Sequence, residues 1–371
     1  MRRTRTRWSA ALLALAAALA LPSAGPSDDA RRARELVERL GAEEFLQREA
    51  AEAELKGIGE PALPAVAAGR HSADPEVRSR ADGLFHQMLR RVGKSASTAM
   101  ELVPVHPREF NMGSPLGELG RRVDEPQHAV RLSRAYLIGA HEVTQGEYRK
   151  VTGSAPSWFA KTGGGKDKVA KHDTDTFPGE QVTWFDAIEF CNRLSALDGF
   201  APYYKLADER RAGGALTGAT VTVAGGNGYR LPTEAEWEFA CRARTEAAFH
   251  FGSVRTGKEG NFKSMRVGGY GGELVTDLGR TAAVGSYPRN RFGLHDAHGN
   301  VAEWCWDWYD KDYYGAAPHT NPAGPAKGTQ RVVRGGSWLV SARSSRSASR
   351  GAQAPAEAAY STGFRVARSP Y

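Results

Sequence analysis

A run rich in arginine and serine near the carboxyl terminus carries the residues best suited to hold a ligand. Arg343, Arg346 and Arg350 alternate with serines, among them Ser345, between positions 341 and 350. Guanidinium groups among hydroxyls suit an anion such as a carboxylate, sulfate or phosphate, because arginine donates paired hydrogen bonds to these groups. The alternative is internal pairing of the arginines with acidic side chains. The candidate partners for such pairing are Asp186, Glu236 and Asp307.

The chain has three cysteines, Cys191, Cys241 and Cys305. No C-x-x-C pair occurs, and His295 and His298, three residues apart, have no third ligand nearby in the sequence, so no zinc site is expected. Three cysteines allow at most one internal disulfide, so disulfides do not hold this fold together. We therefore expect packing roles for the thiols.

The charge of the chain is mildly basic. The net charge is +8, but four arginines fall within the first seven residues, and the remainder is too weakly basic to imply a nucleic-acid partner. The sequence also lacks a G-x-S-x-G motif and a glycine-rich phosphate loop. Nucleic-acid binding, serine hydrolase activity of the G-x-S-x-G type and nucleotide binding by a glycine-rich loop are therefore not expected.

Residues 1–24 have the order of a secretory signal peptide. Arginines come first, then an apolar stretch from Ala10 to Leu21, then small residues. This stretch has 12 residues, whereas a transmembrane helix needs about 20. We therefore expect an exported product, secreted or periplasmic, with no integral membrane segment in the mature chain. The alternative is a retained, membrane-anchoring amino terminus.

Residues 28–92 are charged, free of tryptophan and apolar at helical spacing, which predicts a module of three or four helices. Asp74-Pro75 marks the start of the last helix. Residues 46–70 resemble a HEAT-type repeat, although one or two repeats are fewer than an independent solenoid needs. We expect a helical platform, with a partner-binding surface as the alternative. Residues 93–99, small and polar, are predicted as a linker.

Residues 100–371 form the second predicted domain, in which short strand-like pieces alternate with glycine-rich turns. Helices are predicted over residues 184–197 and 233–242, the second beginning with a capping box of Thr233 and Glu236. Residues 207–227 are predicted as a surface excursion with a turn at 225–228. The expected fold class is α+β, loop-rich, preceded by a small all-α module.

Short motifs follow one another in a fixed order along this second domain. The main blocks are Phe110 to Ser114, Glu142 to Thr144, Gln181 to Ala187, Arg230 to Glu238, Asn290 to Leu294, Gly299 to Trp304, Arg334 to Trp338 and Gly363 to Arg365. In this order the chain resembles the formylglycine-generating, sulfatase-modifying family, whose domain is a variant of the C-type lectin fold. Most of these residues are expected to be structural. Buried ion pairs or stacked rings are expected for Glu236, Trp237, Arg334 and Arg365.

The resemblance implies a specific chemistry for the oxidases of the family. A pair of cysteines a few residues beyond the Gly-Gly-Ser turn binds Cu(I), activates oxygen and oxidises a cysteine of a sulfatase peptide. Thiolates are the soft ligands that Cu(I) requires. Here residues 339–350 contain no cysteine, and none occurs after Cys305. Copper-dependent oxidation of this kind is therefore not expected, and the arginine and serine run would line the groove that holds the peptide in the oxidases.

The resemblance also implies calcium sites. Asn300, the carbonyl of Val301 and Glu303 match one calcium-binding stretch of the family. Asn261, Phe262 and Asp277 are expected to supply a second site through side-chain and carbonyl oxygens, which calcium prefers. The alternative is that these are hydrogen-bonded loop residues without a metal.

The sequence thus predicts a secreted, non-oxidase member of this family that binds a protein partner or an anionic ligand. Two alternatives stay open. One is a sulfatase-modifying oxidase with an unorthodox site, and the other is an enzyme of different chemistry that uses Arg343 and Arg346 in the same groove.

Overall fold

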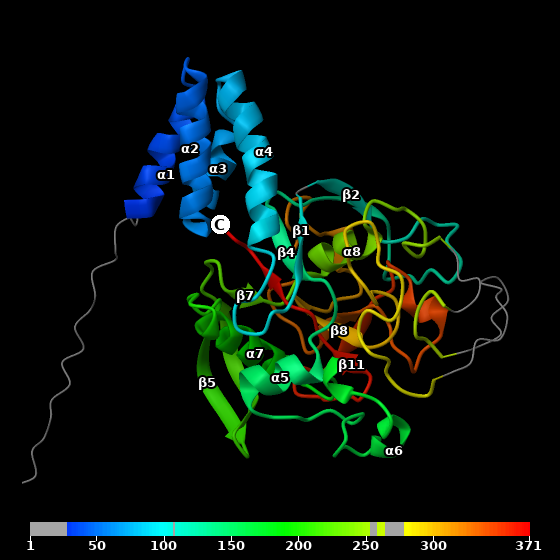
Figure 1. The fold of residues 1–371 in the computed structure, drawn as a ribbon. Helices are drawn as coiled ribbons and strands as arrows, with labels where there is room; N and C mark the ends of the chain where they lie inside the picture. Colours follow the sequence, from blue (N-terminus) through cyan, green and yellow to red (C-terminus); the bar gives the residue numbers. More distant parts are fainter. Residues whose placement is uncertain (1–27, 107, 253–257, 264–277) are drawn as a thin grey trace, which may run out of the picture. The chain divides into compact units, whose positions relative to one another are not determined.

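The structure is a computed structural model and describes residues 28–106, 108–252, 258–263 and 278–371. The chain divides into two compact units between Asp82 and Gly83, within helix α4 (Pro75–Arg91) (Figure 1). The predicted signal peptide, residues 1–24, lies outside the described residues.

The first unit is helical, as predicted. It contains α1 (Asp28–Arg39), α2 (Phe45–Ile58), η1 (Glu60–Ala62), α3 (Leu63–Gly69) and the first turns of α4. Its core is apolar, because Leu36, Leu55 and Val66 are buried. Asp74 accepts a hydrogen bond from the backbone N–H of Glu76, which caps α4 where the sequence predicted its start.

Residues 93–99, predicted as a linker, belong to the second unit and form a hydrogen-bonded turn. Ser95 is buried there. The backbone N–H of Ser97 donates to Asp198 at 2.7 Å. The division of the chain therefore comes about ten residues earlier than the composition suggested, because helix α4 runs across it.

The second unit contains two four-stranded sheets. The first has the order β1 (Leu102–Val105), β4 (Tyr136–Gly139), β12 (Ala367–Arg368), β7 (Tyr229–Arg230), and the second β10 (Gly351–Gln353), β9 (Arg331–Arg334), β8 (Ala302–Trp308), β11 (Thr362–Gly363). Strands β8 and β9 are antiparallel and place Glu303 opposite Arg334, whereas β11 runs parallel to β8 and pairs Gly363 with Glu303. The second sheet therefore brings together motifs that lie far apart in the sequence.

The helices of the second unit are α5 (Gln145–Thr152), α6 (Lys166–Val169), α7 (Trp184–Leu197) and α8 (Glu234–Arg242), with single turns η2 (Thr174–Thr176), η3 (Tyr313–Gly315) and η4 (Ala342–Ser345). Capping boxes begin three of them, at Thr144, Thr183 and Thr233, each closed by an acidic residue at the third helical position. The predicted helix over 184–197 and the predicted capping box at Thr233 are confirmed.

Two hairpins complete the unit. One pairs β2 (Glu109–Met112) with β3 (His128–Arg131), and the other pairs β5 (Tyr204–Ala212) with β6 (Ala215–Val223). The second hairpin is the predicted surface excursion, and its own turn lies at Gly213 and Gly214. The predicted glycine-rich turn at residues 225–228 follows the hairpin, where Gly225 and Gly226 have positive φ angles and the chain bends. Across the described residues, no helix combines the length and the apolar character needed to cross a bilayer.

The core of the second unit holds charged as well as apolar side chains. Its largest fully buried side chains include the rings of Trp184, Trp237 and Trp304. Four arginines are equally buried, and these are Arg334, Arg346, Arg365 and Arg368. An arginine is almost never fully buried unless it is paired. The pairing of these arginines therefore decides what the loops around them can do.

Candidate functional site

The Gly-Gly-Ser turn follows strand β9 and positions the loop that carries the arginine and serine run. Gly335 and Gly336 have φ angles of 88° and 68°, in the left-handed region. A Cβ atom at Gly336 would lie 2.2 Å from the hydroxyl oxygen of Ser345. The loop therefore folds back onto the turn, and only glycine allows this contact.

Arg346 is buried and enclosed by the loop that joins β2 to β3. Its guanidinium group donates to both carboxylate oxygens of Glu125, at 2.8 and 2.9 Å, and to the carbonyl of Gly120. It also forms an ion pair with Glu118. Burial alone would lower the pKa of Arg346, but the two carboxylates outweigh it and the pKa is raised. Arg346 therefore stays charged and is fully occupied by protein groups.

Arg350 is occupied in the same way. It forms a bidentate pair with Glu234, at 2.8 and 2.9 Å, and lies over the ring of Tyr314. It also donates to the backbone carbonyls of Asp124 and Asp310. Burial alone would lower the pKa of Arg350, but the carboxylate of Glu234 outweighs burial, and the pKa is raised.

The predicted anion groove is therefore not assembled from its four residues. Ser345 is buried, and its backbone carbonyl lies 2.7 Å from Nδ1 of His298. Arg343 alone among the four has an exposed side chain, which lies against Gly120. The alternative of internal pairing applies to Arg346 and Arg350, because a buried guanidinium group needs a carboxylate partner.

The acids that pair differ from those that the sequence suggested, because the loops bring distant residues together. Asp186 caps helix α7, Glu236 pairs with Arg230, and Asp307 accepts the backbone N–H of Glu234. Each of these carboxylates is therefore occupied elsewhere in the fold.

Two further buried pairs stabilise the second sheet, as expected for Arg334 and Arg365. Arg365 makes a bidentate pair with Glu303, at 2.5 and 2.6 Å, and Trp237 donates its indole N–H to the same carboxylate at 2.7 Å. Arg334 pairs with Glu238, which also accepts from Arg242. These motif residues are structural in the sense that they hold β8, β9 and α8 together.

The three cysteines are all buried as free thiols. Burial raises the pKa of Cys241 to about 12 and that of Cys305 well above its ordinary value. Cys241 lies 3.6 Å from Nε2 of His298, but the same nitrogen accepts the backbone N–H of His250. The packing role predicted for these residues agrees with this burial, since reactive thiols have depressed pKa values and access to solvent.

The predicted ligands of the first calcium site are engaged in hydrogen bonds. The side-chain oxygen of Asn300 accepts from Asn261 at 3.1 Å and from the N–H of Ala282 at 2.9 Å. Glu303 forms a buried ion pair with Arg365. Hydrogen bonding among loop residues, the alternative to a metal, thus describes Asn300 and Glu303 in this structure, and the calcium site itself stays a prediction.

The second predicted calcium site is described only in part. Asn261 and Phe262 are both buried, and the carbonyl of Asn261 accepts the N–H of Asn300. Asp277 lies outside the described residues.

One buried acid that the sequence analysis did not single out, Glu142, contacts Asn300, and a second, Asp296, interacts electrostatically with Glu142. The amide of Asn300 donates to Glu142 at 3.1 Å. Glu142 and Asp296 each have one buried carboxylate oxygen without a partner among the described residues. Burial and mutual repulsion raise the pKa of Glu142, and burial raises that of Asp296 to about 6. Carboxylate oxygens are ligands for hard cations, but among the described residues no group of three or more acidic, histidine or cysteine side chains is placed to hold a metal ion, so backbone carbonyls or water would have to complete such a site.

A surface of three aromatic side chains, Trp158, Trp338 and Tyr360, lies beside the Gly-Gly-Ser turn and was also missed. The ring of Tyr360 lies 5.9 Å from that of Trp158 and 5.8 Å from that of Trp338. Trp158 and Tyr360 are 41% and 40% exposed. We call these three residues the aromatic surface.

Trp158 of the aromatic surface is held in place by groups packed against it. The backbone N–H groups of Trp158 and Phe159 donate to the buried carboxyl group of Glu180, at 3.0 and 2.8 Å. A Cβ atom at Gly164 would lie 2.3 Å from the Trp158 indole, so the indole packs flat on this glycine. Exposed rings fixed in one place are typical of binding surfaces, because little side-chain entropy is lost on contact.

Comparison with known proteins identifies the second unit. Residues 89–370 match the family described as Sulfatase-modifying factor enzyme 1-like domain. The chain belongs to this family. The expected resemblance and the α+β fold class are therefore confirmed.

Relatives in this family have different names. The chain is 32% identical over 226 residues to the Chaperone protein LppX of Paenibacillus barcinonensis, covering 57% of this chain and 72% of that protein. It is 34% identical over 316 residues to the Formylglycine-generating enzyme of Mus musculus, covering 72% and 74%. It spans only 23% of the Serine/threonine-protein kinase pkn1 of Chlamydia caviae, at 38% identity.

A solved structure gives the same fold. Treponema denticola variable protein 1 matches 75% of this chain and 98% of its own length, with a TM-score of 0.60 and 29% identity. Sulfatase-modifying factor-like domains thus occur under the names of a chaperone, a formylglycine-generating enzyme, a kinase and a variable protein. Membership of the family therefore does not by itself fix the activity of this chain.

Proposed function

We propose that this chain is a secreted, non-oxidase member of the family and binds a partner polypeptide through the aromatic surface. The observation that carries the proposal is the contrast across the Gly-Gly-Ser turn. On one side, Arg346 and Arg350 are neutralised by buried carboxylates and no cysteine is present. By contrast, Trp158 and Tyr360 are exposed and lie against each other, and the Trp158 backbone is held by Glu180.

The name of one relative supports the same interpretation. The relative LppX is called a chaperone protein. Aromatic rings supply large contact area for apolar segments of another chain at low entropic cost. The partner proposed here is accordingly a polypeptide with exposed apolar residues.

Export is part of this proposal. Its support is the amino-terminal order of arginines, apolar residues and small residues. The mass of the protein recovered from the medium or periplasm of an expressing cell tests it. Loss of about 24 residues supports export, whereas a full-length chain retained in the cytoplasm contradicts it.

The competing function is formylglycine generation, and it has a direct test. The purified chain is incubated with Cu(I), oxygen, a reductant and a sulfatase peptide that contains the target cysteine, and the mass of that cysteine is followed. A cysteine-bearing relative serves as the active control. We expect no conversion, and formation of the aldehyde would overturn the proposal.

Partner binding is tested with a heat-unfolded client such as citrate synthase, whose aggregation is followed by light scattering. We expect the chain to slow aggregation, and Trp158→Ala and Tyr360→Ala to lose most of this effect. Leu197→Ala is the matched control, because Leu197 is an exposed apolar residue outside the aromatic surface. Equal protection by all three variants, or no protection by the parent chain, would contradict the proposal.

We also propose that calcium binds through Glu142 and Asp296. Support comes from their unpartnered buried oxygens and raised pKa values. When bound, calcium supplies charge compensation to this acidic pair, which fixes the loop that contains Asn300. The thermal midpoint should rise with calcium in the parent chain and in the control Asp175→Asn, but not in Asp296→Asn. An equal rise in Asp296→Asn would contradict this site.

A further inference from the structure

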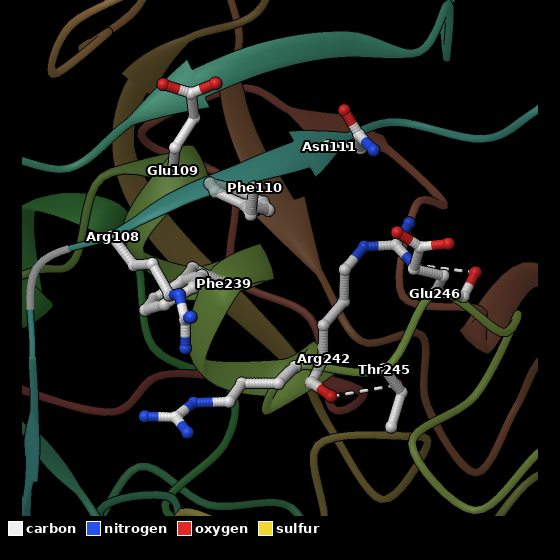
Figure 2. A pocket seen from close by; sticks show the side chains of 9 residues that line it. Arg108, Glu109, Phe110, Asn111, Phe239, Arg242, Thr245 and Glu246 are labelled. Atoms are coloured by element: carbon white, nitrogen blue, oxygen red, sulfur yellow. Dashed lines mark hydrogen bonds between the residues drawn. The ribbon is translucent and has the colours of Figure 1, made fainter.

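A pocket separate from the aromatic surface lies between strand β2 and the end of helix α8. Its volume is about 440 Å³, within the range of small-molecule sites. Residues 108–111 line one side and residues 242–246 the other, with Phe239 between them (Figure 2). No pattern in the sequence predicts this pocket, because its two sides are more than 130 residues apart.

The floor of the pocket is aromatic. The rings of Phe110 and Phe239 lie 5.0 Å apart, and Phe292 packs on Phe239 at 5.6 Å. Phe239 is buried and Phe110 is half-buried, so the exposed part of Phe110 faces solvent through the pocket. This floor suits the flat apolar part of a ligand.

The rim of the pocket carries two arginines, Arg108 and Arg244, that form no ion pair with the described residues. Both side chains are exposed. Arg244 lies over the ring of Phe292, with 5.8 Å between its guanidinium carbon and the ring centre. Figure 2 shows the side chain of Arg108 extending toward Phe239, while Glu109 points away from it. Glu109 lies near His319, at 3.5 Å.

The third arginine of the pocket is already neutralised. Arg242 donates to Glu238 at 2.8 Å and to the carbonyl of Gly113 at 2.7 Å. It therefore shapes the pocket without contributing a free charge. Among the described lining residues, the acid left to oppose Arg108 and Arg244 is Glu246, which lies at the Arg242 end of the pocket in Figure 2.

The backbone at the end of α8 is arranged to place Arg244. Ala243 and Arg244 have φ angles of 45° and 73°, and two successive left-handed residues other than glycine are uncommon. This conformation turns the chain sharply after Arg242, whose carbonyl is capped by the N–H and hydroxyl of Thr245. Strained backbone of this kind is concentrated at functional sites.

The carboxyl end of helix α8 repels an anion, whereas Arg108 and Arg244 attract it. The helix end carries about half a negative charge, which acts over a single turn. Arg108 and Arg244 carry two full positive charges, and Thr245 satisfies the last carbonyl of α8. The carboxylates of Glu109 and Glu246 also line the pocket and offset these two charges. An anion is therefore attracted only close to the two guanidinium groups, away from Glu246 at the Arg242 end and from Glu109, which points away from Arg108 (Figure 2).

We propose that this pocket binds a carboxylate with an aromatic or other flat apolar body, with the carboxylate held by Arg108 and Arg244 and the body on Phe110 and Phe239. The ligand is either a free metabolite or an acidic group beside an aromatic residue of a peptide. Both sources share this chemistry. The site is independent of the aromatic surface.

The proposal is tested by calorimetric titration of the full chain with 3-phenylpropionate. Its neutral amide tests the need for charge, and acetate tests the need for the apolar body. We expect measurable binding of 3-phenylpropionate and at least tenfold weaker binding of both analogues. A peptide ending in Phe-Glu that binds more tightly than 3-phenylpropionate would assign the site to peptides, and weaker binding would assign it to small carboxylates.

Arg108→Gln and Arg244→Gln should each weaken binding of 3-phenylpropionate roughly tenfold or more, because charge-assisted hydrogen bonds are lost. Arg149→Gln is the matched control, since it removes an exposed arginine of the same unit that pairs with Asp175. All three variants should keep the parent unfolding midpoint. Equal binding of acid and amide, no binding by the folded parent chain, or equal weakening by Arg149→Gln would overturn the proposal.

Discussion

The two units of the chain use charge in opposite ways. In the helical unit, ion pairs such as Arg32 with Glu54 lie on the surface, and the buried positions are apolar. In the second unit, Arg365, Arg334, Arg346 and Arg350 are buried with their carboxylates. Exposed pairs contribute little, whereas breaking a buried pair leaves an uncompensated charge. Buried ion pairs thus stabilise the second unit, which has short strands and long loops, at many points. The helical unit is stabilised instead by the packing of apolar helix faces.

The largest expected effect comes from breaking one buried pair. Glu303→Gln leaves Arg365 buried without a charge partner, so the free energy of unfolding of the second unit should fall by about 3 to 5 kcal/mol. Urea denaturation followed by tryptophan fluorescence measures this, because seven of the eight tryptophans lie between positions 158 and 338. A loss below about 1 kcal/mol would place this pair with the surface pairs.

In the helical unit, a comparable loss of unfolding free energy is expected only from substitution of a buried apolar residue. Leu55 is fully buried, so Leu55→Ala should cost about 2 to 5 kcal/mol through lost burial and a cavity. Far-ultraviolet circular dichroism during urea denaturation reports this unit, which has no tryptophan among residues 28–82. If Leu55→Ala had no effect while surface charge changes did, the contrast between the units would fail.

Two histidines of the second unit should make its stability depend on pH. Burial lowers the pKa of His250 to about 4 and that of His298 to about 3, below the ordinary 6.5. At these two histidines the unfolded chain binds more protons than the folded chain between pH 6.5 and about 4, so their contribution to stability falls as the pH decreases through this window, by on the order of 3 kcal/mol each. Buried carboxyl groups with raised pKa values, such as Glu180 and Asp296, act in the opposite direction.

The measurement is urea denaturation of the second unit at several pH values. His298→Gln should flatten the pH dependence. An unchanged slope in that variant would mean that other groups control acid stability.

The smallest expected effect belongs to the surface pairs. Glu54→Gln removes the exposed partner of Arg32, and its urea midpoint should be indistinguishable from that of the parent chain. Added salt should likewise leave the stability of the helical unit unchanged, since screening acts on interactions that contribute little. A clear destabilisation by Glu54→Gln would show that surface charge holds the helices together.

Local features were predictable because their signals lie within a few residues. The helix over 184–197 follows from the Thr183 cap and from apolar spacing, and Thr233 with Glu236 marks the start of α8. The partners of Arg346 and Arg350 were not predictable, because Glu125 and Glu234 lie more than 100 residues away. Pairing of this kind depends on how loops fold, which composition and spacing do not encode.

Other misses have physical reasons of their own. The turn of the long hairpin lies at Gly213 and Gly214, between two strands of equal length. The sequence analysis singled out only the longer glycine-rich stretch at 225–228 as a turn, so the hairpin turn was missed. The aromatic surface depends on Gly164 lying beneath Trp158. The pocket depends on the left-handed backbone after Arg242. None of these contacts leaves a pattern in the sequence.

The β5–β6 hairpin has a consequence for how copies of this protein behave when crowded. A two-stranded sheet presents backbone groups that a neighbouring copy can pair with. Here strand β5 has a register irregularity between Ala207 and Arg210, with Asp208 at a positive φ, and its exposed end carries Glu209 and Arg211. An irregular, charged edge is a poor template for a further strand. The hairpin can therefore project from the domain without promoting stacking of one copy on the next.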